Sequence, residues 1–362
     1  MSKLTLPGLI DPHVHLRDPG QTNKEDFFTG TGSALAGGFT TILDMPNNKL
    51  PITTMRRLEE KIKIAKEKIV CDVGFYFGSM GDNINELIRI KDKVLGLKLY
   101  LSLTTGGFVI PKEKVEQVFI AWNQGRKTKD QRPILLHAED DTLDFAINLS
   151  KKLGSKIHIC HISTMSDLKQ IIKAKKNNLL ITCGVTPHHL FLTQDDVKEL
   201  GPFGKMKPSL ATKKDQEFLW KNLEFIDLIE SDHAPHTLEE KRGEVTPFGV
   251  PGLETTLPLL LTAASQNRLE ISDIVRLCHT NPAKIFNIRT NSSTRIQIDL
   301  NSSFIINNLS LFTKCGWSPF DGWEAKGKIE KVWIRTEKVF ENGKILAKPG
   351  FGKVLTDNHI KR

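Results

Sequence analysis

The chain has 362 residues, of which 39% are hydrophobic and 26% are charged, and its formal net charge is +9 at pH 7. Its longest apolar stretches fall well short of the roughly 20 residues that span a bilayer, and its N-terminus lacks the apolar region of a signal peptide. Lysine and arginine are spread out without a recognition motif or interleaved aromatic residues, which favours solvated helix faces over a nucleic-acid groove. We therefore expect a cytoplasmic, soluble protein that binds neither membranes nor nucleic acids.

Eight short apolar runs of β type recur along the chain, and amphipathic stretches of helical period separate most of them. We predict strands at Leu6–Leu16, Thr40–Met45, Asp72–Phe77, Leu97–Leu101, Ile134–Leu136, Ile157–Ile159, Leu180–Val185 and Phe225–Ile229. Helices are predicted at Met55–Lys68, Lys112–Gln124, Thr142–Leu153 and Thr164–Lys176. Strands that alternate with helices form a parallel sheet, so eight such units predict an α/β fold, a (β/α)8 TIM-type barrel.

The last part of the chain has a different pattern. Helical periodicity is lost, and β-type runs follow at Ile296–Leu300, Phe304–Asn307 and Val332–Val339, with Asn342-Gly343 as a two-residue hairpin signal. A barrel of this kind takes about 250 residues, so a second element is needed. We expect a barrel over residues 1–290 and a small β subdomain formed mainly by residues 291–362.

Several potential metal ligands stand at the carboxyl ends of the predicted strands, where a barrel of this kind builds its active site. His13 and His15 are two residues apart on an extended chain, so both imidazoles can point at one metal ion. His137 and His161 follow two successive strands, and Asp232 follows the last strand. A carboxylate there can bind a metal and also accept the proton of a nucleophilic water, although it could instead cap a helix. The pattern predicts a metallohydrolase.

Lys98 is unusual because it lies inside the apolar run Gly-Leu-Lys-Leu-Tyr-Leu. Burial lowers the pKa of an amine, and the neutral amine reacts with carbon dioxide. The resulting carbamate would be an anionic ligand able to bridge two metals. The alternative is a lysine that is ion-paired inside the barrel.

Seven segments carry a resemblance that covers nearly the whole chain: residues 7–20, 45–47, 96–101, 158–161, 186–192, 231–241 and 251–255. They include Asp-Pro-His-Val-His-Leu-Arg-Asp-Pro-Gly, Met-Pro-Asn and Ser-Asp-His-Ala-Pro-His-Thr-Leu-Glu-Glu-Lys. The chain resembles the dihydroorotases of the amidohydrolase superfamily, in particular the dihydroorotase domain of the animal-type multifunctional pyrimidine-synthesis polypeptide. The resemblance implies reversible closure of N-carbamoyl-L-aspartate to L-dihydroorotate in pyrimidine biosynthesis.

The same resemblance implies a role for each matching residue. Two zinc ions would be bound, one by His13, His15 and Asp232 and the other by His137 and His161, with carboxylated Lys98 and a hydroxide between them. Asp232 would act as general acid and base. The substrate would be bound by Arg17, Asn47 and His236 and by the backbone of Phe248 and Gly249, under a lid loop that contains Thr104 and Thr105.

Two departures from the family pattern concern the rest of the site. Gly184 stands where the animal-type domain has a glutamate, which argues against a third zinc at His189. Lys207 replaces the arginine or asparagine usual near the substrate, a change that would act on affinity. Neither departure touches the residues expected to bind the two zinc ions.

The resemblance also implies partners, and it leaves two other functions open. A homodimer is expected, as is a link to carbamoyl-phosphate synthetase and aspartate transcarbamoylase domains in one polypeptide. Another cyclic amidohydrolase, such as an allantoinase or dihydropyrimidinase, would share the metal site. A non-catalytic scaffold is the third reading, and the complete ligand set argues against it. His-Leu-Arg-Asp-Pro-Gly with Met-Pro-Asn favours an acidic substrate and therefore dihydroorotate.

Overall fold

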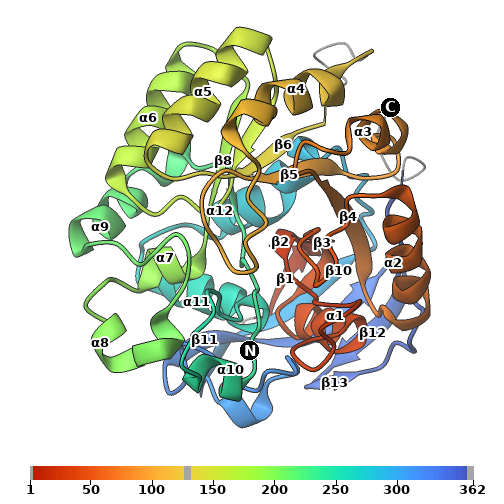
Figure 1. Ribbon diagram of the computed structural model, residues 1–362. Helices are drawn as coiled ribbons and strands as arrows, with labels where there is room; N and C mark the ends of the chain where they lie inside the picture. Colours follow the sequence, from red (N-terminus) through yellow and green to blue (C-terminus); the bar gives the residue numbers. More distant parts are fainter. Residues whose placement is uncertain (1–2, 126–131, 357–362) are drawn as a thin grey trace.

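The computed structural model describes residues 3–125 and 132–356, and it contains the predicted barrel (Figure 1). Eight parallel strands pair in chain order: β2 (Leu9–Val14), β3 (Phe39–Asp44), β4 (Asp72–Gly78), β5 (Gly96–Tyr100), β6 (Ile134–His137), β7 (Ile157–Ile159), β8 (Ile181–Val185) and β9 (Leu228–Ile229). A parallel bridge between Val14 and His233 brings the first strand next to the segment that follows the last. The carboxyl ends of all eight strands therefore meet at one end of the molecule.

Helices surround this ring of strands, as Figure 1 shows for α2, α4, α5 and α6. The helices of the barrel are α1 (Phe27–Ala36), α2 (Met55–Lys68), α3 (Ile84–Ile90), α4 (Lys112–Asn123), α5 (Asp141–Leu153), α6 (Met165–Lys176), α7 (Pro187–Phe191), α8 (Val197–Leu200), α9 (Lys213–Lys221), α10 (Leu238–Arg242), α11 (Leu253–Ser265), α12 (Ile271–Val275) and α13 (Asn281–Ile285). Helix α2 has the predicted bounds. Its Thr54 cap accepts from Arg57 N, and its Leu58 and Ala65 are buried in the core.

A second, antiparallel sheet has the strand order β1-β10-β11-β12-β13. Its strands are β1 (Lys3–Pro7), β10 (Arg295–Ile305), β11 (Glu324–Ile334), β12 (Glu337–Glu341) and β13 (Lys344–Ile345). Asn342 and Gly343 link the last two strands with φ values of 47° and 77°, as the hairpin signal predicted. The sheet combines the C-terminal segment with one strand from the N-terminal end, and a domain boundary at residues 290–291 stays a prediction.

The predicted single strand Leu6–Leu16 is wrong, because the structure divides it into β1 and β2 at Gly8. A Cβ atom at Gly8 would overlap the Thr40 side chain, so only glycine fits where the chain passes from one sheet to the other. The predicted run Val332–Val339 is likewise interrupted by a turn, in which Arg335 has a φ of 62°.

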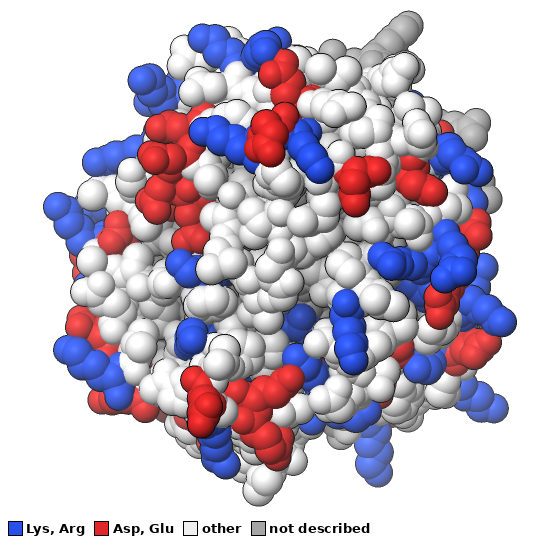
Figure 2. Space-filling view, in the orientation of Figure 1, with Lys and Arg blue, Asp and Glu red and all other residues white. Residues whose placement is uncertain are grey.

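Figure 2 shows lysine and arginine interspersed with aspartate and glutamate over the visible face. No helix within residues 3–125 and 132–356 is long and apolar enough to cross a membrane. All five cysteines are buried and free.

Candidate active site

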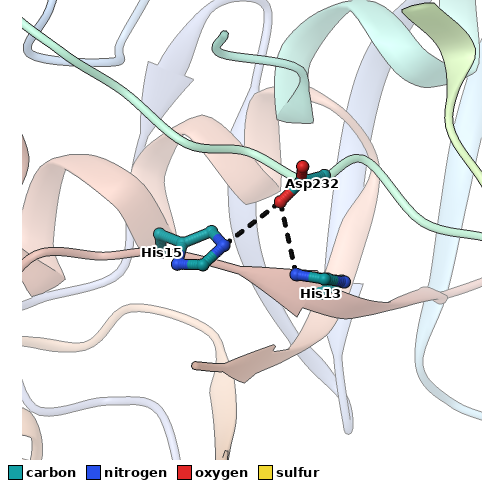
Figure 3. Close-up of side chains that lie close together, drawn as sticks. All are labelled: His13, His15 and Asp232. Atoms are coloured by element: carbon teal, nitrogen blue, oxygen red, sulfur yellow. Dashed lines mark hydrogen bonds and ion pairs between the residues drawn. The ribbon is translucent and has the colours of Figure 1, made fainter. Parts of the chain in front are cut away.

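His13, His15 and Asp232 converge at the carboxyl end of the barrel, as Figure 3 shows. The Nε2 atoms of His13 and His15 lie 3.3 Å and 3.1 Å from Asp232 Oδ1. His13 belongs to β2, His15 follows it, and Asp232 comes from the segment after β9. Asp232 has a φ of 45°, a strained conformation for a residue with a side chain. Strain of this kind is common where a side chain must be aimed at a functional site.

The hydrogen bonds of these two histidines fit a metal site. His13 Nδ1 donates to Glu230 Oε2 at 3.0 Å, and His15 Nδ1 donates to Asn47 Oδ1 at 2.7 Å. Burial lowers the pKa of His15 to about 3, so this imidazole is neutral at pH 7. The Nε2 lone pairs are thus directed at the Asp232 carboxylate, and these groups repel each other unless a cation lies between them. The donor set fits a divalent metal ion.

His137 and His161 lie beside this group and form a second pair of nitrogen ligands. The ring centroids of His13 and His161 are 5.1 Å apart, and those of His137 and His161 are 4.8 Å apart. His137 Nδ1 and His161 Nε2 face each other at 3.1 Å, and His137 Nε2 lies 3.3 Å from Glu139 Oε1. Burial holds the pKa of His161 well below its usual value. Imidazole nitrogens that face each other in a buried site are ligands that zinc prefers.

Lys98 lies on β5 at the same end of the barrel, and its side chain is fully buried. Its Nζ atom is 3.1 Å from Cys160 Sγ. Within the part of the chain that the structure describes, no carboxylate oxygen lies within 4.0 Å of Nζ. The structure therefore does not contain the buried ion pair that was the alternative interpretation of this lysine.

Most of the predicted substrate-binding residues line one pocket with the ligands. Its walls are formed by His13, His15, Arg17, Asn47, Tyr100, Thr104, Thr105, His137, His161, Lys207, Asp232, Ala234, Phe248 and Gly249. Arg17 is buried, and its Nε donates to Pro235 O at 3.1 Å. His236 lies behind Arg17, with Nε2 at 3.2 Å from a guanidinium nitrogen. The pocket thus presents two cationic side chains, Arg17 and Lys207, near the candidate metal ligands.

The loop after β5 reaches over the pocket and contacts the opposite wall. Thr105 Oγ1 accepts from Phe248 N at 2.8 Å and donates to Phe248 O at 3.0 Å. Gly106 and Gly107 follow with positive φ values of 92° and 64°. Thr105 therefore occupies the backbone groups of Phe248 that were predicted to bind substrate.

His189 is set apart from the ligand group. Its Nδ1 bonds Thr186 Oγ1 at 2.8 Å, and its Nε2 lies 3.0 Å from Pro208 O. Both ring nitrogens are therefore used by protein groups, and a third metal at His189 finds no support in this geometry.

Two buried residues of the site had no predicted role. Glu230 follows β9 directly, bonds His13 and accepts from the backbone N–H of His161. A Cβ atom at Gly184, on the neighbouring strand β8, would overlap Glu230 Oε1. Cys160 forms a group with His13 and Glu230 in which the potential ligand atoms lie within 4.8 Å of one another. The strand-end rule that found Asp232 also applies to Glu230, which stands two residues earlier.

Replacing Glu230 with glutamine is expected to lower activity or metal affinity about 10- to 100-fold, because the carboxylate fixes His13 with Nδ1 protonated. Burial raises the pKa of Glu230, but His13 outweighs this effect and holds the net pKa well below its usual value. Metal content measured by mass spectrometry, together with turnover, checks the expectation. Glu254→Gln is the matched control, since burial raises the pKa of Glu254 to about 7 and its partners include Phe312 N, outside the pocket. Full metal content and turnover in Glu230→Gln would contradict this role.

Comparison with known proteins agrees with the barrel fold. Residues 4–346 match the model of the family described as "Amidohydrolase family". The chain therefore belongs to the amidohydrolase family.

More specific likenesses are found within that family. The chain is 36% identical to the dihydroorotase of Pyrococcus horikoshii over 381 aligned residues. The alignment covers 99% of this chain and 86% of the relative. It is 40% identical to the multifunctional protein CAD of Squalus acanthias over 97% of this chain, although it spans only 15% of that much longer protein. A solved L-hydantoinase (dihydropyrimidinase) from Arthrobacter aurescens superposes with a TM-score of 0.92 at 26% identity, over 98% of this chain and 89% of that one.

Proposed function

We propose that this chain is a dihydroorotase, which interconverts N-carbamoyl-L-aspartate and L-dihydroorotate. The observation that carries the proposal is that five of the six proposed ligands, His13, His15, His137, His161 and Asp232, line one pocket with the buried cation Arg17. Arginine binds a carboxylate through two parallel hydrogen bonds, and L-dihydroorotate differs from dihydrouracil by a carboxylate. The likeness to dihydroorotases at 36% identity, over nearly the whole chain, supports the same assignment.

We propose two zinc ions as the cofactor, held by His13, His15 and Asp232 and by His137 and His161, with carboxylated Lys98 as the shared ligand. When bound, such metals lower the pKa of water and polarise the scissile carbonyl. The neutral imidazoles and the unpaired Lys98 amine support this arrangement. Metal analysis of the purified protein, with about two zinc ions per chain expected, tests it.

The protein's own groups then bind and orient the substrate and move its proton. Arg17, with Asn47 and His236 beside it, holds the carboxylate and fixes the ring against the metal ligands. Asp232 takes the proton from the attacking water when the ring amide is hydrolysed and gives it to the leaving nitrogen. The neighbouring imidazoles outweigh the effect of burial and hold the pKa of Asp232 well below its usual value, so its carboxylate is available as a base at neutral pH.

Hydrolysis of L-dihydroorotate, followed by the loss of its ultraviolet absorbance, tests the function directly. Allantoin and dihydrouracil are measured in parallel, with zinc quantified on the same sample. Turnover of dihydroorotate alone supports the proposal. Turnover of only the neutral rings would assign the chain to the hydantoinase-like group, and a metal-loaded protein without any turnover would make it a scaffold.

Arg17→Ala is expected to lower kcat/KM for L-dihydroorotate about 10- to 100-fold, as expected for losing hydrogen bonds to a charged group. The zinc content should stay at the wild-type level, because Arg17 contacts Pro235 O and His236 and none of the proposed ligands. Steady-state kinetics and metal analysis on the same preparation check this. A variant that loses its metal would show that Arg17 has been given the wrong role.

The setting of the enzyme is also a proposal. Five buried free cysteines suit a reducing compartment, and we propose a cytoplasmic location. We further propose a homodimer, which sedimentation analysis would test. Association with carbamoyl-phosphate synthetase and aspartate transcarbamoylase domains is proposed from the likeness to CAD.

A further inference from the structure

Lys241 is a buried lysine near the pocket, and its ammonium group bonds three backbone carbonyls. It lies on α10, and its side chain is fully buried. Its Nζ donates to Lys205 O at 3.0 Å, to Pro247 O at 3.1 Å and to Gly249 O at 3.1 Å. Among the described residues, no carboxylate oxygen lies within 4.0 Å of Nζ. Burying an ammonium group without a counter-ion costs free energy, and the three hydrogen bonds to carbonyl oxygens offset that cost. Losing one of these bonds would leave the buried charge less well solvated, so the bonds stabilise the local backbone conformation.

These bonds decide which way the neighbouring peptide groups face. The carbonyls of Pro247 and Gly249 are turned towards Lys241, while both backbone groups of Phe248 between them are turned towards Thr105. Gly249 packs closely against the backbone of Ala234, since a Cβ atom at Gly249 would lie only 2.7 Å from Ala234 O. Phe248 and Gly249 both line the pocket. The backbone of this wall is thus fixed from its outer side.

Trp317 extends the same support to His236. The Lys241 ammonium lies 5.5 Å from the centre of the Trp317 ring, a distance typical of a cation–π contact. The indole Nε1 donates to His236 O at 2.7 Å. Lys241 and Trp317 therefore contact each other on the outer side of the pocket wall. Lys241 fixes the backbone of Pro247 and Gly249, and Trp317 fixes that of His236.

We propose that Lys241 is a positioning residue of the substrate pocket, which holds the backbone of Pro247 and Gly249 so that Phe248 and Gly249 keep their places in the pocket wall. The inference rests on the proposed dihydroorotase function and adds a residue to it that contacts neither substrate nor metal. Its effect should appear in substrate binding rather than in the metal centre.

The test is Lys241→Met, which keeps most of the unbranched side chain and removes all three N–H donors. KM for L-dihydroorotate should rise about tenfold or more, while kcat stays within about threefold and the zinc content is unchanged. Hydrogen–deuterium exchange of a peptide covering residues 244–252 should become faster. Arg242→Met is the matched control, because Arg242 is exposed on the same helix and loses the same charge. The control should show wild-type KM and exchange.

An unchanged KM and unchanged exchange in Lys241→Met would overturn the proposal, as would a parallel loss of zinc and kcat. If Lys241→Met does not fold, Lys241→Gln decides, since its shorter side chain carries two N–H donors instead of three and can restore only part of these contacts. A KM between wild type and about tenfold above it supports the positioning role, and a wild-type KM refutes it. A wild-type enzyme inactive on dihydroorotate would refute the proposed function. The comparison of hydrogen–deuterium exchange between wild type and Lys241→Met would still test whether Lys241 fixes residues 244–252.

Discussion

Lys98→Ala is expected to lower turnover of L-dihydroorotate by at least about a thousandfold, equivalent to several kcal/mol of metal-dependent transition-state stabilisation. Bound zinc should fall in the same variant, because the proposed shared ligand is removed. Lys98 is fully buried, with Cys160 Sγ at 3.1 Å as its hydrogen-bond partner. Strand β5 has the sequence Gly-Leu-Lys-Leu-Tyr, so no other residue of this strand could provide a bridging carboxylate.

Two companion measurements separate the carbamate from a simple cation. Lys98→Arg retains a positive charge but cannot react with carbon dioxide, so it should be as inactive as Lys98→Ala. A small carboxylic acid added to Lys98→Ala can enter the space left by the side chain and should restore part of the activity and zinc binding. Full turnover in either variant, without added acid, would eliminate the carbamate.

Asp232→Asn should produce the second large effect, a loss of about 10²- to 10⁴-fold in kcat, as expected for removing a general base. The amide keeps the size of the side chain but neither accepts the proton nor balances a metal charge. Steady-state kinetics in both reaction directions check this, because one group serves as base for hydrolysis and as acid for ring closure. The two directions should lose rate together.

Asn47→Ala serves as the comparison for Asp232→Asn. Asn47 bonds the same His15 from the other side, at 2.7 Å from Nδ1, but carries no charge. Its replacement should cost about 10- to 100-fold, as for other residues that orient a metal ligand. If Asp232→Asn were no worse than Asn47→Ala, the proton transfer would have to be assigned to another group.

The sequence predicted the barrel well because each of its units leaves a local signal. Helix α2 has the predicted bounds, since its apolar residues recur with helical period between a threonine cap and a basic last turn. The pairing of β1 with β10 left no such signal, because Lys3 and Asp299 are partners across almost the whole length of the chain. The interruption of the strand at Gly8 could not be predicted either, because this position requires glycine only through its contact with Thr40 in the folded chain.

The candidate site divides in the same way. Residues at strand ends, such as His161 and Asp232, could be found by position along the chain. Glu230 was missed although it stands at such an end, because its space depends on Gly184 in the adjacent strand. Lys241 and Trp317 were beyond reach for a different reason: their partners are backbone atoms, which a sequence does not distinguish.

The antiparallel sheet has a consequence for how the protein is made. All six proposed ligands precede residue 233, but β1, six residues upstream of His13, pairs only with β10, which begins at Arg295. A growing chain on the ribosome therefore completes its ligand set before its first strand has a neighbour. Trp317, which supports His236, emerges later still. The support of His236 is therefore completed only after all six proposed ligands have been synthesised.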